Sequence, residues 1–231
     1  MKRAMLTALV AARRNRQAAV LVRGLTSGRQ CVVTERECHG DTDVMDASII
    51  QAARAALRLD GASVIEASGE PFLVQTEASP VRLFIIGAVH IAQALIPMAR
   101  QLGFELCLID PRTAFASPER FPDILIDNRW PKEAMPDYRL DARTAVVALS
   151  HDPKIDEPAL QAAMDSSAFY IGALGSKANH LKRLGRLAAL GYSDEQLRRI
   201  HGPIGLPLGG RSPAEIAVST LAQVIQSRNS G

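Results

Sequence analysis

The sequence predicts an α/β fold in which a doubly wound parallel sheet follows a small α+β domain. Three observations lead to this prediction: from residue 81 short strands alternate with helical segments, these strands are almost entirely apolar, and glycine or polar residues follow several of them. Apolar strands separated by helices are typical of a parallel sheet that helices cover on both faces.

The first part of the chain has a different pattern, which predicts the small α+β domain over residues 1–78. We expect helices over 4–15 and 46–58, and strands near 18–23, 30–34, 62–66 and 71–76. The segment "TEASP", residues 76–80, is polar and ends in proline, so we place the domain boundary there.

Residues 81–231 then form a Rossmann-like domain. We expect strands over 82–87, 105–110, 123–127, 144–150 and 168–174, and helices over 90–102, 156–165 and 176–190. Ser212, Pro213 and Glu215 form the capping box that begins a last helix. Ser193 and Gln196 repeat this box before a short helix that ends at residue 200.

Composition narrows the possible functions. The 231 residues are 47% hydrophobic and 22% charged, as in an ordinary globular protein. The net charge of +3 and the 4% aromatic content fall short of what nucleic-acid binders use. No apolar run approaches the roughly 20 residues that span a bilayer, and no signal-peptide pattern is present. We therefore expect a cytoplasmic protein with no membrane or nucleic-acid partner.

The carboxyl ends of the predicted parallel strands are the place to look for a ligand, because open α/β sheets bind there, where the strand order reverses. Candidate residues gather at four strand ends. They are Gly87, Ala88, Val89 and His90; Asp110 and Arg112; His151 and Asp152; and Gly175, Ser176 and Lys177. We expect these residues to line one cleft.

The loop at Gly87 resembles a dinucleotide-binding turn without its second glycine. Gly87 suits the tight turn and Ala92 the close helix packing, but Val89 places a β-branched side chain where a pyrophosphate comes closest. The helix amides would still attract an anion. Two interpretations stay open, a ligand-binding loop and a plain strand-to-helix turn.

Asp110 and Arg112 allow two interpretations. Asp110 stands 23 positions after Gly87, near the spacing of an acidic residue that holds a ribose hydroxyl, and Arg112 suits a phosphate. Alternatively, the two side chains pair with each other across the turn at Pro111. His151 and Asp152 suit an acid/base pair, metal ligands together with Asp156, or a helix cap; we predict no metal site and no catalytic residue.

The segment 175–186 carries a run of basic residues on the predicted helix. We expect Leu181, Leu184 and Ala188 to face inward and the basic side chains to form a solvated face. These are Lys177, Lys182, Arg183 and Arg186. The helix begins at a strand's carboxyl end, where Ser176 and Lys177 would meet a phosphate.

Five blocks of residues 81–226 resemble the XdhC/CoxI family of accessory proteins of molybdenum hydroxylases. They are "IIGAVHIAQAL", "IDPRTAFASPERFPD", "TAVVALSHDPKIDEPAL", "FYIGALGSKANHLKRL" and "RIHGPIGLPLGGRSPAEIAVSTLAQVI", in the family's order and spacing. They cover about two-thirds of the chain.

The resemblance implies a chaperone rather than an enzyme. Members of this family bind molybdenum cofactor, as molybdopterin or its dinucleotide form, assist its sulfuration and pass it to the apo molybdenum hydroxylase, of the xanthine dehydrogenase or carbon monoxide dehydrogenase type. The expected partners are that hydroxylase, a cysteine desulfurase, a cofactor nucleotidyltransferase and a second copy in a homodimer. The smaller domain that precedes the Rossmann domain also matches the family's order.

The N-terminal third departs from the family's pattern. Many members carry a "GSVSGGC"-like block with a cysteine implicated in cofactor binding or sulfuration, whereas this chain has "LTSGRQCVVTE". Cys31 stands in the corresponding place but lacks the flanking glycines. It is a candidate for that role, and the alternative is a buried apolar cysteine.

Two other functions remain open. Gly87 and Asp110 also suit an NAD(P)-dependent oxidoreductase, although no Tyr-Lys pair or catalytic His-Arg arrangement is evident. The third possibility is a scaffold that keeps the fold and acts only through protein contacts.

Overall fold

The computed structural model describes residues 2–42, 45–57 and 60–230. The chain divides into two compact units, Met1–Ser79 and Pro80–Gly231. Residue 58, the predicted end of the second helix, and the terminal residues 1 and 231 lie outside the described residues.

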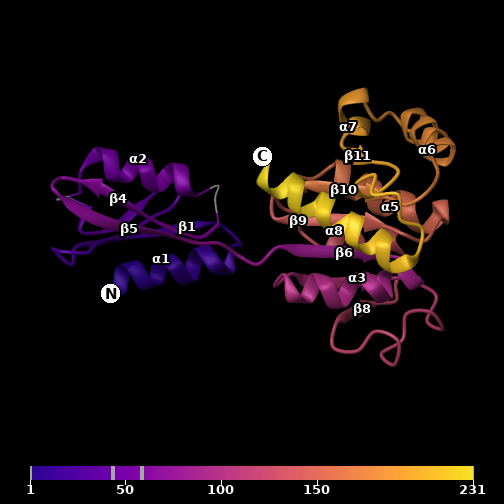
Figure 1. The fold of residues 1–231 in the computed structure, drawn as a ribbon, viewed down its shortest axis with the longest axis horizontal. Helices are drawn as coiled ribbons and strands as arrows, with labels where there is room; N and C mark the ends of the chain where they lie inside the picture. The colour runs from indigo at the N-terminus through magenta and orange to yellow at the C-terminus, as the bar shows by residue number, and fades with distance from the viewer. Residues whose placement is uncertain (1, 43–44, 58–59, 231) are drawn as a thin grey trace. The chain divides into compact units, whose positions relative to one another are not determined.

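The first unit is an antiparallel sheet with two helices (Figure 1). Its strand order is β3-β2-β1-β5-β4. The strands are β1 (Ala19–Gly24), β2 (Gln30–Val33), β3 (Cys38–Gly40), β4 (Ala62–Ala67) and β5 (Glu70–Glu77), and the helices are α1 (Arg3–Arg14) and α2 (Ala47–Ala56). The short strand β3 was absent from the prediction because three half-buried residues give no apolar alternation.

The two faces of this sheet bury different apolar side chains. Alternate residues of a strand point to opposite faces, so β1 and β2 contribute to both. Ile49 of α2 packs with Val22 and Phe72 on one face, while Met5 of α1 packs with Val32 in a second cluster. Each helix therefore covers one apolar face of the sheet.

The second unit confirms the predicted α/β fold. Its six strands are all parallel, in the order β11-β10-β9-β6-β7-β8. They are β6 (Arg82–Ile86), β7 (Glu105–Ile109), β8 (Leu125–Asp127), β9 (Thr144–Ala148), β10 (Tyr170–Ala173) and β11 (Ile200–His201). Read in chain order, this is the doubly wound arrangement 3-2-1-4-5-6 of a Rossmann domain.

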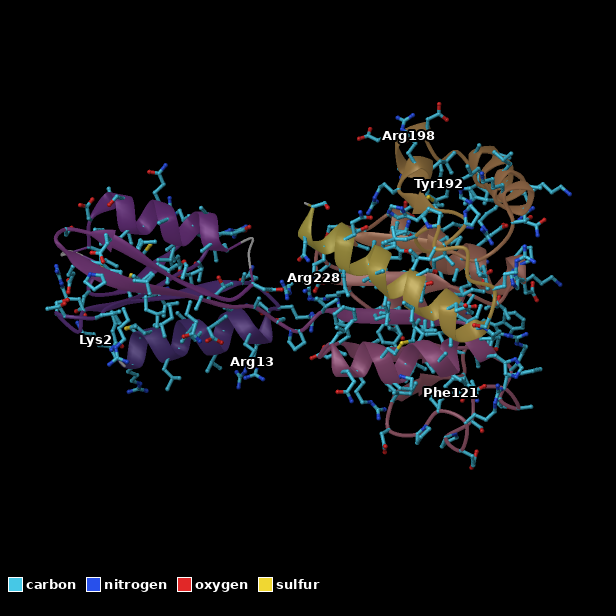
Figure 2. The ribbon with its side chains drawn as sticks, in the orientation of Figure 1. Lys2, Arg13, Phe121, Tyr192, Arg198 and Arg228 are labelled. Carbon is cyan, nitrogen blue, oxygen red and sulfur yellow. The ribbon has the colours of Figure 1, made fainter. Side chains whose placement is uncertain are left out.

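Helices cover both faces of the parallel sheet (Figure 1). On one face α3 (His90–Gln101) and α8 (Pro213–Asn229) pack together, with Leu95 and Val224 fully buried. On the other face lie α4 (Pro131–Ala134), the 3-10 turn η2 (Met135–Asp137) and α5 (Pro153–Met164), with Leu160 fully buried. Side chains fill the layers between helices and sheet (Figure 2).

Local capping signals place several helix starts. Both predicted capping boxes are present, at Ser212 before α8 and at Ser193 before α7 (Asp194–Arg198). In contrast, α5 begins three residues before the predicted position 156, because Asp152 caps it and Pro153 occupies its first turn. The predicted short helix ends before residue 200, which belongs to β11.

The orientation of α6 (Lys177–Ala189) corrects one prediction. Leu181 is 68% exposed and Ala188 is exposed too, although both were expected to face inward. The buried positions are instead His180, Arg183 and Leu187. The buried face therefore includes a basic residue that a hydrophobic pattern assigns to solvent.

Candidate functional site

The strand order of the parallel sheet reverses between β6 and β9, so the loops after these two strands form the switch point. Gly87 lies in the first loop with φ +106°, a conformation that favours glycine. A Cβ atom at this position would lie 2.8 Å from the backbone nitrogen of Ser150 in the second loop. The absence of a side chain at Gly87 therefore lets the two loops pack closely.

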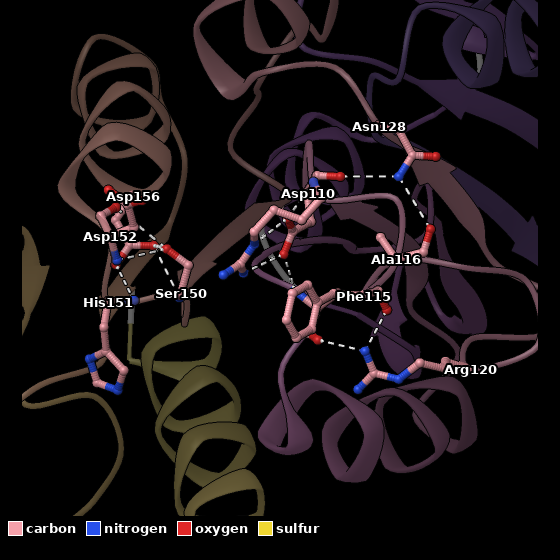
Figure 3. A network of polar contacts seen from close by, with 11 residues as sticks. Asp110, Phe115, Ala116, Arg120, Asn128, Ser150, His151, Asp152 and Asp156 are labelled. Atoms are coloured by element: carbon pink, nitrogen blue, oxygen red, sulfur yellow. Dashed lines mark hydrogen bonds and ion pairs between the residues drawn. The ribbon is translucent and has the colours of Figure 1, made fainter.

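Asp110 ties the end of β7 to the Gly87 loop (Figure 3). Its carboxylate accepts the Ala88 amide at 2.7 Å on Oδ2, and Arg112 donates Nη2 to Oδ2 at 2.7 Å and its amide and Nε to Oδ1 at 2.9 Å each. A carboxylate has about four acceptor positions, and four donors fill them here. Of the two interpretations left open, the pairing across the Pro111 turn is the one that the structure contains, and Asp110 has no acceptor position left for a ribose hydroxyl.

This carboxylate is fully buried and ionised. Burial by itself raises the pKa of Asp110, but the hydrogen bonds from Arg112 and the Ala88 amide outweigh it and hold the pKa below its usual range. The pKa of Arg112 is raised, first by Asp110 and further by Asp152 and Asp156. Arg112 therefore lies within electrostatic reach of the loop after β9.

The segment between β7 and β8 is held by its own arginines. Arg112 lies over the ring of Phe115, with 4.8 Å from Cζ to the ring centroid, and Arg120 donates to the Phe115 carbonyl at 2.6 Å. Asn128 donates to the carbonyl oxygens of Asp110 at 3.1 Å and Ala116 at 3.2 Å (Figure 3). These contacts fix the guanidinium of Arg112 at the rim of the sheet.

A second polar network follows β9. The buried carboxylate of Asp156 accepts the hydroxyl of Ser150 at 2.7 Å and the amides of Ser150 and His151 at 3.1 Å each (Figure 3). His151 itself has φ +65°, a conformation that is uncommon for a residue other than glycine. Asp156 thus fixes a turn that leaves the His151 side chain exposed.

Asp156 lies next to a buried cation. Burial raises the pKa of Asp156, while its hydrogen bonds with Ser150 and the charge of Arg183 act in the opposite direction. Arg183 Nη2 is 3.8 Å from Asp156 Oδ2 and donates to the Leu174 carbonyl at 2.9 Å. The basic helix α6 is therefore connected to the loop after β9 through Arg183.

The remaining predicted residues have separate environments. Val89 is half-buried against the apolar cluster under α3, and His90 is exposed. Asp152 accepts the Lys154 amide as the cap of α5, which is the helix-cap interpretation of that residue. Gly175 has φ +142°, Ser176 caps α6, and Lys177 is exposed.

The structure brings together the Gly87 loop, Asp110 and Arg112 directly, and joins His151 to Asp156 and Arg183. The sequence analysis considered Asp156 only as a metal ligand or helix cap, placed Arg183 on a solvated face, and did not consider His180. Asp156 could have been recognised from sequence, because an acidic residue in the first turn of a helix that follows a strand lies close to the backbone amides there. Nothing in a basic helical run distinguishes Arg183 from its exposed neighbours.

Two kinds of feature are absent from the part of the chain that the structure describes. No group of three or more His, Cys, Asp or Glu side chains lies close enough to hold a metal ion within residues 2–42, 45–57 and 60–230. Over the same ranges, no helix combines the length and apolar character needed to cross a membrane.

Cys31 has the properties of a core thiol. It is fully buried in β2 against α2, and burial raises its pKa to about 11. At neutral pH such a thiol stays protonated, and a protonated thiol is a poor nucleophile. These observations favour the apolar-cysteine interpretation over a direct part in sulfuration.

The arrangement of the second unit agrees with a comparison against protein families. Residues 83–224 match the family model described as the XdhC Rossmann domain. The chain belongs to the XdhC family.

Among curated XdhC relatives, the molybdenum cofactor insertion chaperone PaoD of Escherichia coli (strain K12) is 34% identical over 148 residues, covering 64% of this chain and 40% of PaoD. A probable xanthine dehydrogenase subunit of Bacillus subtilis (strain 168) is 31% identical over 159 residues, covering 68% of this chain and 46% of that protein. The chain thus spans less than half the length of these XdhC relatives.

A solved structure shares the fold. A crystal structure of a xanthine dehydrogenase from Bacillus halodurans superposes with a TM-score of 0.73, at 22% sequence identity, over 98% of this XdhC-family chain and 65% of that one. At this identity the likeness concerns the fold alone.

Proposed function

We propose that this protein binds molybdenum cofactor at the carboxyl edge of its parallel sheet and delivers it to a molybdenum hydroxylase of the xanthine dehydrogenase or carbon monoxide dehydrogenase type. The cofactor is cargo here and not a resident group. Membership of the XdhC family and the name of the relative PaoD support the class of cargo. The observation that carries the proposal is the pair of polar loops joined at Gly87 and Ser150, at the switch point of the sheet.

The residues at this edge suit a molecule with a phosphate or pyrophosphate group. The side chain of Arg112 is 36% exposed, and its Nη1 makes no hydrogen bond among the described residues, so it has a free donor for a phosphate oxygen. The amide end of α3 adds favourable polarity for an anion. Asp110 fixes the guanidinium of Arg112 and does not bind the cargo itself.

We further propose that the protein presents the cofactor to a cysteine desulfurase, so that sulfur is added before insertion. Because Cys31 is buried and protonated, this thiol would not serve as a carrier for the sulfur that the desulfurase provides. A Cys31→Ala variant that still supports sulfuration would agree with this proposal, and loss of sulfuration in a folded variant would contradict it.

The alternative of an NAD(P)-dependent oxidoreductase has less support. Ribose recognition needs a free carboxylate acceptor, and four donors already occupy Asp110. The structure favours a ligand that approaches Arg112 over one that approaches Asp110.

The proposed function is tested by incubating the purified protein anaerobically with molybdenum cofactor released from a hydroxylase. We expect the cofactor to stay with the protein during gel filtration, where its oxidised pterin is measured by fluorescence, and to activate an apo-hydroxylase added afterwards. Arg112→Ala should reduce retention, whereas Arg198→Ala, an exposed site on α7 (Figure 2), should not. If folded wild-type protein retains no pterin and activates no hydroxylase, the proposal is wrong.

A further inference from the structure

A pocket of about 190 Å³ opens between the loop after β9 and helix α6. This volume far exceeds the roughly 10–15 Å³ that one water molecule needs. His151 and Pro153 line it from the loop, Leu174 from the end of β10, and Asn179, Lys182, Arg183 and Arg186 from α6, with Glu157 of α5 opposite. It therefore lies beside the switch point but involves different side chains from Asp110 and Arg112.

The charges around this pocket are mostly positive. Glu157 is its one acidic lining residue, and Glu157 accepts Nε of Arg186 at 2.7 Å, which largely neutralises both charges. Lys182 is exposed at the rim and forms no ion pair among the described residues. Lys182 and Arg183 thus give the pocket a positive charge, of which the Asp156 carboxylate, 3.8 Å from Arg183 Nη2, offsets a part.

Arg183 is the deepest of these cations and is incompletely bonded. Its side chain is 7% exposed. Its Nη2 has the Leu174 carbonyl at 2.9 Å and Asp156 at 3.8 Å, but its buried Nη1 has no hydrogen-bond partner among the described residues. Buried donors are nearly always bonded in native proteins, because an unsatisfied one costs free energy. An anion in the adjoining pocket would supply the missing acceptor.

We propose that this pocket is a phosphate-binding site, in which Arg183 and Lys182 hold the phosphate oxygens and Asn179 and His151 add hydrogen bonds. Nη1 of Arg183 has unbonded N–H donors for phosphate oxygens while Nη2 stays with the Leu174 carbonyl, and a rim lysine adds a mobile positive charge. The identity of the molecule that carries the phosphate rests on the proposed function, under which it is the phosphate or pyrophosphate end of the cofactor.

Isothermal titration of the full-length protein with inorganic pyrophosphate tests this site. We expect saturable binding to the wild type, weakening of at least about tenfold in Arg183→Lys, which keeps the charge but loses the fork, and a smaller loss in Lys182→Ala. Arg198→Ala removes an exposed arginine elsewhere in the same unit and should bind as the wild type does. Circular dichroism establishes that each variant is folded.

The inference would be overturned if the wild type showed no saturable pyrophosphate binding. It would also be overturned if Lys182→Ala and Arg183→Lys each bound pyrophosphate as tightly as the wild type. The exposed position of Lys182 keeps the test decisive if Arg183→Lys fails to fold. Retention of pterin without pyrophosphate binding would refute this pocket and leave the proposed function intact. Pyrophosphate binding that the variants weaken, without pterin retention, would support this pocket and refute the proposed function.

The source of the phosphate is distinguished by competition. If molybdenum cofactor displaces pyrophosphate from the wild type, the pocket binds the phosphate end of the cargo. Displacement by a nucleoside diphosphate such as CDP, and not by the nucleotide-free pterin form, would assign the same pocket to a nucleotide end. Displacement by neither would contradict the assignment to the cargo.

Discussion

The carboxylate of Asp110 accepts the backbone amide of Ala88 at 2.7 Å, so the residue that follows β7 holds the loop that follows β6. The carboxyl ends of the neighbouring strands β6 and β7 are thereby joined by a hydrogen bond. The bond uses a carboxylate that Arg112 also pairs with, and this carboxylate is fully buried.

Asp110→Asn should lower the free energy of unfolding by about 2–4 kcal/mol, because the amide removes the charge and turns a donor toward the other donors. Chemical denaturation measures this loss. Asp123→Asn is the matched control, since Asp123 is exposed with φ +59°, which asparagine tolerates, and it should change stability by less than about 0.5 kcal/mol. Equal stability of the two variants would contradict the role of Asp110.

Gly87→Ala should destabilise the second unit by more than about 2 kcal/mol. The new Cβ would meet Ser150 backbone atoms at 2.8–2.9 Å, and alanine also disfavours φ +106°. Gly103→Ala provides the control, since φ there is +74° but a Cβ would meet nothing within 4 Å. Thermal unfolding should show a clearly smaller loss for Gly103→Ala, and similar losses would mean that the contact with Ser150 contributes little.

Protonation of His180 should make the protein less stable in mild acid. Burial, followed by the charge of Arg183, lowers the pKa of His180 below its ordinary value of 6.5. The unfolded chain therefore takes up the proton first as the pH falls, so stability is full above pH 6.5 and declines below it. Denaturation between pH 8 and pH 5 measures the decline.

His180→Gln should make this pH dependence shallower, whereas His90→Gln, at an exposed residue, should leave it unchanged. Some dependence should remain in His180→Gln because burial also lowers the pKa of His201. An identical pH profile for wild type and His180→Gln would show that His180 is not the group responsible.

NAD(P)H should not bind saturably to the wild type or to Val89→Gly. Removing the valine side chain opens the loop but frees no acceptor on Asp110, whose four positions remain occupied. Fluorescence titration of the nicotinamide measures binding. Saturable binding to the wild type would contradict our interpretation of this loop, and binding to Val89→Gly alone would show that Val89, and not Asp110, excludes the dinucleotide.

Cys31 should react with iodoacetamide much more slowly than Cys38 in the native protein. Cys31 is fully buried with a pKa raised to about 11, whereas Cys38 in β3 is partly exposed. Mass spectrometry of peptides after timed alkylation separates the two sites. Denaturant should equalise their rates, and rapid native alkylation of Cys31 would mean that this thiol is accessible.

The features that sequence predicted well are those set by short-range signals. Apolar runs such as "RLFII" and "TAVVA" marked the parallel strands, and the capping serines at 193 and 212 marked two helix starts. The strand ends also pointed to the loops at Gly87, Asp110 and His151 as neighbours at one edge of the sheet, and their part in binding a ligand stays a prediction. Each of these signals lies within a few residues of the element it defines.

The features that sequence missed depend on distant parts of the chain. The burial of Arg183 depends on its contact with Leu174, and that of His180 on the close approach of Gly202, where a Cβ would lie 2.1 Å from Nδ1 of the histidine. The two-residue strand β11 exists only because β10 provides a neighbour. Periodicity along one helix carries no information about such partners, so Leu181 and Ala188 of α6 were wrongly expected to be buried, whereas Leu184 does pack against the core.

The close packing of Gly87 on Ser150 has a thermodynamic consequence for any cargo. Because the two loops leave no room for even a Cβ atom on Gly87, a ligand that pushes one loop toward the other would displace both. Binding at Arg112 and binding in the pocket beside Arg183 would then be linked, and by reciprocity each would change the affinity of the other by the same factor. A cargo long enough to reach both positions would be released more readily once one of its ends is withdrawn.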